Sequence, residues 1–531
     1  MAMNSFWNHK WFLALTAPVL LALSFPPFNA SILQIPAFVL LFRLSVISDT
    51  KREAIFYAYP SFVLWNLFST YWLMMATVAG GAAAIFANAA IMLIPLLLIR
   101  FVINQNRFHP LLTGLLAASI WVSYEFLHHN WDLAWPWLTL GNGWSNLTSV
   151  IQFISVTGVF GISFWVILTA FLCYHWLVQP ERKHLIYTLA AFFIFPIWSI
   201  FSLTQIESDE SRPVEVAIVQ PNTDSYQSLG GHPNLESLIE HLLRLSNEAR
   251  SEQTDLIIWP ENAIASNLII DSPFFDRVKD SLNVWETNLI AGTGLFNFYD
   301  DENRPQVYRE TANGRSYNVY NSALYFQPSQ PTKVYRKTEL VPIVERFPFV
   351  EFFQNVDLFG WVNWPDIAGY GRGTTPDLFN VVEQHTPALI CYDSVFSGLV
   401  NRFVDEGADF LTIITNDGWW GDSHGHIQHF AFARLRAIEH RMWIARSANN
   451  GISGIISPDG KVQIQTEYWT EDAFRFTIYG NPNRTFYSRH GNWIGGLSLV
   501  IMGFGFIGGF IRGRTQLSEK LERSDSPDTS G

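Results

Sequence analysis

Residues 54–99, AIFYAYPSFVLWNLFSTYWLMMATVAGGAAAIFANAAIMLIPLLLI, contain no Lys, Arg, Asp or Glu. A bilayer core about 30 Å thick requires about 20 mostly apolar helical residues, so this stretch is long enough for two membrane-spanning helices. The pair Gly80-Gly81 near its middle predicts the turn between them. The segment therefore indicates a chain that crosses a membrane.

Apolar segments of similar composition lie on both sides of this stretch. The charge-free residues 11–42 provide room for two helices, separated at Pro26-Pro27. Four further segments provide one span each: 109–130, 157–178, 184–204 and 490–511. The sequence therefore predicts a polytopic α-helical bundle of about eight spans.

The order of these segments divides the chain into four parts. We expect a seven-span bundle over residues 1–204, an extracytoplasmic domain over 205–489, an eighth transmembrane helix over 490–511 and a disordered cytoplasmic tail over 512–531. The tail is expected to be disordered because it is rich in Ser, Asp and Glu and poor in aromatic residues.

Basic residues in the loops predict the orientation of the bundle. Cytoplasmic loops of membrane proteins collect Lys and Arg, and here these residues fall on alternate loops: Lys10; Arg43, Lys51 and Arg52; Arg100 and Arg107; Arg182 and Lys183; Arg512 and Arg514. The loops near Phe28, near Gly80 and over 131–150 contain none. Both termini are therefore expected in the cytoplasm, and seven crossings place residues 205–489 on the outer face.

The composition of the 531-residue chain excludes several classes of protein. Only 15% of its residues are charged, against about 25% in ordinary globular chains, and residues 1–204 hold only eight basic and five acidic side chains. A net charge of −12 without a long run of Lys or Arg argues against a nucleic-acid partner. A transporter would need charged residues in mid-span, and Glu125 is almost alone there.

The outer domain alternates strand-like and helix-like segments. Six β-branched runs predict strands: 214–220, 256–259, 288–294, 322–326, 388–391 and 410–415. Apolar residues that recur every three or four positions predict helices over 235–250 and 427–446. Such alternation indicates an α/β domain, in which chemistry gathers beyond the carboxyl ends of the strands.

Three residues at or near strand ends suggest a catalytic group. Glu261 follows one predicted strand, Cys391 ends another, and Lys337 lies between them in the chain. A thiolate can attack a carbonyl, a carboxylate can take and return the thiol proton, and a lysine ammonium can stabilise the oxyanion. Taken singly, Glu261 could cap a helix, Lys337 could be a solvated surface charge and Cys391 could be a small core residue. Their shared setting favours catalysis.

Several ordered motifs resemble those of the apolipoprotein N-acyltransferases, the membrane-embedded branch of the nitrilase superfamily. The motifs are Trp259-Pro260-Glu261, Tyr335-x-Lys337-x-x-Leu340-Val341-Pro342-x-x-Glu345, Cys391-Tyr392, Thr415-Asn416-Asp417-x-Trp419, Gln428-His429-Phe430, Arg446-Ser447-x-Asn449-Asn450-Gly451, Tyr487-x-Arg489-x-Gly491-Asn492-Trp493 and Pro136-Trp137-x-x-Leu140-Gly141. With seven spans before them and one after, the ordered set covers nearly the whole chain.

This resemblance implies a nitrilase-like α-β-β-α sandwich seated on the helical bundle. It implies that an acyl chain passes from a phospholipid to the cysteine as a thioester, and then to the N-terminal amine of a diacylglyceryl-cysteine apolipoprotein. The implied roles are general base for Glu261, oxyanion donor for Lys337, nucleophile for Cys391 and second essential carboxylate for Glu345, while Tyr392 and Asp393 line the nucleophile.

The resemblance further implies no cofactor and no metal. It places the chain in a bacterial inner membrane, with the catalytic domain in the periplasm and lipids as its surroundings, and we expect a monomer. A membrane-tethered amidase that hydrolyses a small amide with the same three residues is the alternative.

Several residues have more than one interpretation. His424, His426 and His429 could bind a metal, but Gln428-His429-Phe430 already belongs to the family motif. Glu125 is a functional candidate unless it reaches water at the interface. Four tryptophans could form an acyl-chain entrance or an interfacial belt: Trp131, Trp135, Trp137 and Trp144. Asp393, where the family usually has Glu, could orient the nucleophile or cap a helix from Ser394.

Overall fold

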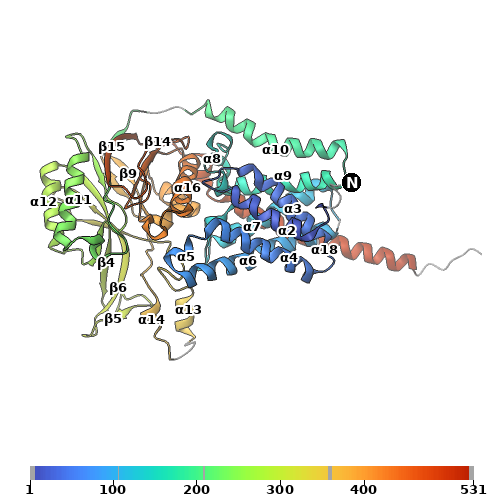
Figure 1. The fold of residues 1–531 in the computed structure, drawn as a ribbon, viewed down its shortest axis with the longest axis horizontal. Helices are drawn as coiled ribbons and strands as arrows, with labels where there is room; N and C mark the ends of the chain where they lie inside the picture. The colour runs from blue at the N-terminus through green and yellow to red at the C-terminus, as the bar shows by residue number, and fades with distance from the viewer. Residues whose placement is uncertain (1–5, 106, 207–209, 357–360, 525–531) are drawn as a thin grey trace, which may run out of the picture.

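Eight long helices form a bundle in the computed structural model, which describes residues 6–105, 107–206, 210–356 and 361–524 (Figure 1). They are α2 (Lys10–Leu23), α3 (Gln34–Ile47), α4 (Lys51–Thr70), α6 (Val78–Gln105), α7 (Pro110–His128), α9 (Val159–Val178), α10 (Arg182–Leu203) and α18 (Trp493–Ser524). Each overlaps one of the eight predicted segments, but the predicted number of about eight membrane spans is not confirmed. By length and composition, α6, α7, α9 and α10 could each cross a membrane, whereas α2, α3 and α18 contain shorter apolar stretches.

The predicted break at Pro26-Pro27 is confirmed, but the predicted turn at Gly80-Gly81 is wrong. Both glycines lie inside α6, and the chain turns before it, around the short helix α5 (Leu73–Ala76). A Cβ atom on Gly81 would lie 2.6 Å from the backbone nitrogen of Met74. The glycine is therefore needed for the close approach of α5 and α6 rather than for a turn.

The loop after α7 is folded into the protein. It contains the short helices η2 (Pro136–Leu138), η3 (Leu140–Trp144), η4 (Thr148–Val150) and α8 (Ile154–Thr157). Glu125 of α7 accepts hydrogen bonds from the indole of Trp121 and from the backbone N–H of Leu140, both at 2.9 Å. It is 3% exposed. Glu125 therefore fastens this loop inside the bundle and does not reach water.

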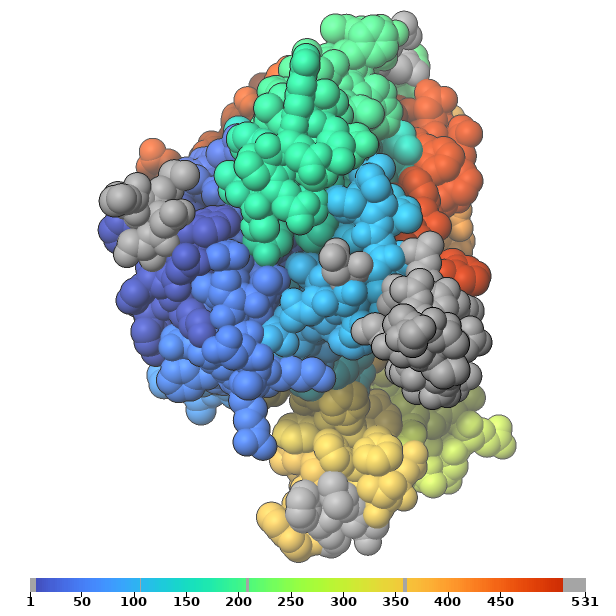
Figure 2. Space-filling view, turned by 90° about the vertical axis from the view of Figure 1, so that its right-hand side faces the viewer, coloured from blue at the N-terminus to red at the C-terminus, as the bar shows by residue number. Residues whose placement is uncertain are grey.

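Helices α10 and α18 lie at the edge of the bundle. In both views α10 runs along its outside (Figure 1, Figure 2), while α18 packs along α7. Helix α18 continues to Ser524, so the tail predicted to be disordered from residue 512 is helical to that point. The helix-favouring sequence QLSEKLER after Thr515 accounts for this. Residues 525–531 lie outside the described residues.

The domain predicted over residues 205–489 contains two main β-sheets. The first is ordered β15-β1-β2-β4-β6-β5, with β3 on β4 and β7 on β6. Its strands are β1 (Pro213–Gln220), β2 (Leu256–Ile258), β3 (Ile264–Leu268), β4 (Asn288–Tyr299), β5 (Arg309–Glu310), β6 (Ser316–Phe326), β7 (Lys333–Arg336) and β15 (Asp472–Tyr479). The second is ordered β10 (Ala388–Ile390), β11 (Leu411–Thr415), β12 (Ile444–Ala448), β13 (Gly454–Ile456) and β14 (Val462–Gln465). All six predicted strands are present.

The two sheets pack face to face between helices. Along β1, Val216 and Ile218 belong to the core shared with the second sheet, whereas Ala217 and Val219 pack with α11 (Leu235–Ala249) and α12 (Phe274–Trp285). This alternation follows the period of two in a strand. Helices α15 (Ser397–Asp405) and α16 (His424–His440) lie on the second sheet's side. The predicted α-β-β-α sandwich is confirmed.

Helix α16 joins the domain to the bundle, because it also contacts α4, η4 and α8. The prediction of one helix over 427–446 is wrong at its end. Arg441 adopts a left-handed conformation that stops the helix after His440, and the apolar run that follows becomes β12. A buried strand and a buried helix segment cannot be distinguished by hydrophobicity alone.

A smaller segment projects beside the bundle. It contains α13 (Val350–Asn355) and α14 (Trp364–Ile367) and lies beyond the end-on outline of the bundle in Figure 2, where it is yellow. Asp132 of the α7–η2 loop accepts a hydrogen bond from the backbone of Phe349 at 2.8 Å and pairs with Arg372 at 3.4 Å. A two-stranded sheet of β8 (Phe379–Val381) and β9 (Gln384–Thr386) then leads to β10.

Candidate active site

Glu261 lies beyond the end of β2 and is 4% exposed. Its Oε1 accepts a hydrogen bond from the Asn321 amide at 2.7 Å, and its Oε2 accepts one from the backbone N–H of Asn416 at 3.0 Å. Gly292 of β4 makes room for this turn, because a Cβ there would lie 2.5 Å from the Cα of Glu261. The carboxylate is thus held between β6 of the first sheet and the end of β11 in the second.

Lys337 follows β7 and is 1% exposed. Its Nζ lies 3.2 Å from Oε1 of Glu261 and 2.8 Å from Oε1 of Glu345. Burial alone would lower the pKa of Lys337, but these two carboxylates raise it well above its usual value. Burial, together with the charge of Glu345, raises the pKa of Glu261, although Lys337 opposes the change. The lysine is therefore a fixed cation beside a carboxylate that can take up a proton.

Cys391 follows β10, begins the short helix η6 (Cys391–Val395) and is 8% exposed. Its φ of 48° lies in the left-handed region, which is rare for a residue with a side chain. Burial raises the pKa of its thiol well above the usual value, as does the charge of Glu261, while Lys337 lowers it. The resting thiol is therefore protonated and needs a base to become a nucleophile.

The structure brings the three predicted catalytic residues together with Glu345. Glu261, Lys337, Glu345 and Cys391 line one cavity. The second oxygen of Glu345 accepts a hydrogen bond from the backbone N–H of Val341 at 2.8 Å, which fixes the loop after Lys337. The prediction that these residues form one site agrees with this geometry.

Tyr392 and Asp393 hold the turn at Cys391 in different ways. The hydroxyl of Tyr392 donates to the carbonyl of Ala134 in the bundle at 2.9 Å, and Tyr392 lines the cavity. Asp393 is fully buried and accepts hydrogen bonds from the backbone N–H groups of Ile390 and Glu339 and from the hydroxyl of Tyr335.

Asp393 therefore ties the nucleophile turn to the loop that follows Lys337. Burial raises its pKa to about 7, while Lys337 and the two N–H donors lower it. It does not cap a helix from Ser394, because the next α-helix, α15, starts at Ser397.

The three histidines considered as metal ligands do not converge. His424 packs against Phe28 and Tyr71, and His426 stacks on Tyr468. Only His429 approaches the site, where it, Cys391 and Asp417 place one potential ligand atom each within 4.8 Å of one another.

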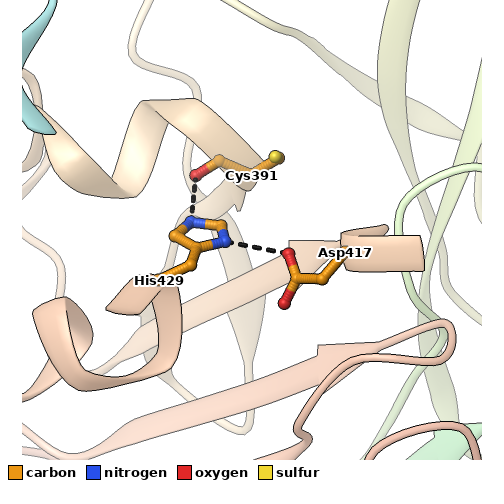
Figure 3. A group of neighbouring side chains, drawn as sticks. All are labelled: Cys391, Asp417 and His429. Carbon is orange, nitrogen blue, oxygen red and sulfur yellow. Dashed lines mark hydrogen bonds and ion pairs between the residues drawn. The ribbon is translucent and has the colours of Figure 1, made fainter. Parts of the chain in front are cut away.

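These three residues fit a hydrogen-bonded network better than a metal site. The imidazole of His429 contacts Asp417 at 2.9 Å and the carbonyl oxygen of Cys391 at 3.2 Å, and the sulfur points away from it (Figure 3). Arg446 donates to the second oxygen of Asp417 at 2.7 Å. Burial would raise the pKa of Asp417, but Arg446 and His429 lower it below the usual range. The guanidinium of Arg446 therefore already supplies the positive charge that a metal ion would bring to Asp417.

The cavity has a volume of about 460 Å³ and extends from the site to the bundle. Its apolar side is formed by small residues on one side of α5 and α6: Ala76, Gly80, Gly81, Ala83, Ala84 and Ala87. Trp135 and Trp137 also line it. Trp144 instead lies buried in the bundle with its indole on Gln34, and Trp131 is 40% exposed. The entrance interpretation therefore fits two of the four predicted tryptophans.

Sequence reasoning missed Asn321 and the walls of the cavity. Asn321 donates to both Glu261 and Glu345, at 2.7 and 3.2 Å. The strand predicted over 322–326 begins after Asn321, so the local pattern carried no signal for this residue. Trp72 and the small residues of α6 also carried no signal, because they have the composition of an ordinary membrane helix.

Comparisons with known proteins agree with this architecture. Residues 215–482 match the family model described as carbon-nitrogen hydrolase, and residues 17–172 match the apolipoprotein N-acyltransferase N-terminal domain. The chain is 29% identical to the apolipoprotein N-acyltransferase of Chlorobaculum tepidum over 94% of its own length and 97% of that protein. It is 26% identical to apolipoprotein N-acyltransferase 2 of Treponema denticola, over 86% and 88%, and 26% identical to the apolipoprotein N-acyltransferase of Wigglesworthia glossinidia brevipalpis, over 91% and 94%.

Proposed function

Because this chain belongs to the apolipoprotein N-acyltransferases of the carbon-nitrogen hydrolase family, we propose that it transfers an acyl chain in two steps through Cys391. The chain is an acyltransferase, and its reaction is the N-acylation of lipoproteins. The donor we propose is a phospholipid, and the acceptor is the N-terminal amine of a diacylglyceryl-cysteine apolipoprotein. The observation that carries the proposal is the single cavity shared by the catalytic residues and by α6.

In the first step Glu261 takes the proton of the Cys391 thiol, and the thiolate attacks an ester carbonyl of the phospholipid. Lys337 donates to the oxyanion as the carbon–sulfur bond forms. The carbon–oxygen bond then breaks, Glu261 returns the proton to the leaving oxygen, and a lysophospholipid departs. The product on the enzyme is an acyl thioester.

In the second step the amine of the apolipoprotein attacks the thioester carbonyl. Glu261 takes a proton from the amine as the carbon–nitrogen bond forms, and Lys337 again stabilises the oxyanion. The carbon–sulfur bond breaks, and the cysteine sulfur regains its proton from Glu261. The site returns to its starting state with an amide as product.

The amidase alternative makes a different use of the same residues. A small amide needs no apolar wall, whereas the cavity is lined by at least six small residues of α5 and α6. The test is to incubate the purified protein with a dipalmitoyl phospholipid and a synthetic diacylglyceryl-cysteine peptide. We expect N-palmitoyl peptide and lysophospholipid in equal amounts. Free palmitate without acylated peptide would favour a hydrolase.

Asp393 gives a prediction about the nucleophile turn. Its three partners are all hydrogen-bond donors, so Asp393→Asn turns one amide N–H₂ toward a donor. We expect thioester formation to slow by on the order of a hundredfold, while Asp393→Glu keeps substantial activity because the charge is retained. Single-turnover acylation measures both, with thermal unfolding as the control for folding. Near-normal rates for Asp393→Asn would remove this residue from the site.

The proposed orientation predicts which side of the membrane each loop faces. We propose that the catalytic domain faces the periplasm from a bacterial inner membrane. Residues 137–145 are buried, so we place one reporter cysteine at the exposed Asn130. A second reporter cysteine is placed at the exposed Asn104, at the opposite end of the bundle. In a Cys173→Ser, Cys391→Ala background, an impermeant thiol probe should label Asn130→Cys in intact spheroplasts. It should label Asn104→Cys only after lysis, and the reverse pattern would overturn the orientation.

A further inference from the structure

Two consecutive residues near the start of α16 contact the two parts of the molecule. Gln428 is 1% exposed and faces the helical bundle, while His429 is also 1% exposed and faces the nucleophile turn. Successive residues on a helix point about 100° apart. One turn of one helix therefore contacts both the bundle and the backbone of Cys391.

Gln428 makes hydrogen bonds with four separate residues of the bundle. Its Oε1 accepts from the indole N–H of Trp137 at 2.7 Å and of Trp72 at 3.3 Å. Its Nε2 donates to the carbonyls of Pro26 and Ser69, each at 3.1 Å. These bonds use both donors and both acceptor positions of the amide. A fully bonded side chain in a buried interface fixes the relative positions of its partners.

The two indoles held by Gln428 form part of the cavity. Trp72, Trp137 and Trp420, here called the tryptophan wall, all line it, and their rings lie 4.7–5.6 Å apart between centroids. Trp137 and Trp420 also pack against the imidazole of His429. The tryptophan wall is therefore contacted by both Gln428 and His429.

We infer that Gln428 is a positioning residue that holds the tryptophan wall in register with Cys391, so that a lipid chain in the cavity meets the nucleophile in a reactive geometry. His429 holds the other side by its bond to the carbonyl of Cys391. This inference rests on the proposed function. Gln428 does not line the cavity, so its effect on the reaction passes through the two indoles.

If Gln428 positions the tryptophan wall, its replacement should slow the reaction of Cys391 with phospholipid much more than its reaction with a small alkylating reagent. In a Cys173→Ser background, iodoacetamide reports on Cys391 alone, and mixed micelles of detergent and a dipalmitoyl phospholipid report on thioester formation. For Gln428→Met we expect alkylation within about threefold of the parent, whereas acylation falls by on the order of a hundredfold, the cost of a misplacement near 1 Å. The loss should appear in kcat more than in KM. Gln428→Glu keeps an acceptor for both indoles but loses the donor to the carbonyls of Pro26 and Ser69, so it should restore only part of the rate.

A matched control comes from Gln152, another fully buried glutamine between the bundle and the outer domain. It donates to the carbonyls of Thr148 and Asp459 and accepts from Arg441, and it does not line the cavity. Gln152→Met should change alkylation and acylation by the same small factor. Equal loss of both reactions in Gln428→Met, or the same profile in the two variants, would overturn the inference. A parent protein that alkylates but gains no acyl group would instead overturn the proposed function.

Discussion

Replacing Cys391 by Ser is expected to abolish thioester formation and transfer, with a loss of at least about a thousandfold in the rate of acylation. A hydroxyl is far harder to deprotonate than a thiol, and burial already raises the pKa of this thiol well above its usual value. The carboxylate of Glu261 is a much less effective base toward an alcohol than toward a thiol, because the pKa of the alcohol is far higher. The measurement is single-turnover acylation by phospholipid.

Cys173 provides the control for this prediction. It lies half-buried within α9 and far along the chain from the site, so Cys173→Ser should acylate at the parental rate. A Cys391→Ser protein with the parental melting temperature that still transfers the acyl chain would contradict the role of this thiol.

Lys337→Met is expected to have the second large effect, on the order of a thousandfold in both half-reactions. The ammonium lies 2.8 and 3.2 Å from two buried carboxylates, so its removal takes away the proposed oxyanion donor and leaves two like charges facing each other. Breaking a buried pair in this way should also lower the thermal stability. Thioester formation and transfer from a preformed thioester can be timed separately.

The pH dependence of Lys337→Met distinguishes loss of chemistry from loss of folding. Lys337 opposes the burial that raises the pKa of Glu261, so its removal should raise that pKa further. Because the base must be ionised, the rate of acylation should rise with pH in the parent, and in the variant the rise should shift to higher pH. An unshifted profile with only a lower plateau would mean that Lys337 does not control the base.

Much of the fold could be predicted from the sequence because its segments are strongly patterned. The charge-free runs place the bundle helices, and the β-branched runs place the strands of both sheets. The errors lie where the local pattern is ambiguous. Gly80-Gly81 reads as a turn but serves the contact of α5 with α6, and the end of α16 depends on the left-handed Arg441 rather than on hydrophobicity.

The structure brings together the predicted site residues whose chemistry is specific. Glu261, Lys337 and Cys391 sit at or near strand ends, and the ends of neighbouring strands converge in space. Asn321, Trp72 and Trp420 could not be found in the same way, since their importance depends on contacts between segments far apart in the chain. Trp72 and Gln428, for example, are joined by one hydrogen bond across the two parts of the molecule.

In the proposed reaction, Cys391 carries the acyl chain between the two substrates. Intact-mass analysis of the purified protein after incubation with a dipalmitoyl phospholipid tests it directly. We expect the added mass of one palmitoyl group on the Cys391 peptide. Neutral hydroxylamine should remove this group, and addition of a diacylglyceryl-cysteine peptide should discharge it. An unmodified protein that nevertheless produces N-palmitoyl peptide, or an acyl group that persists in Cys391→Ala, would contradict this role of Cys391.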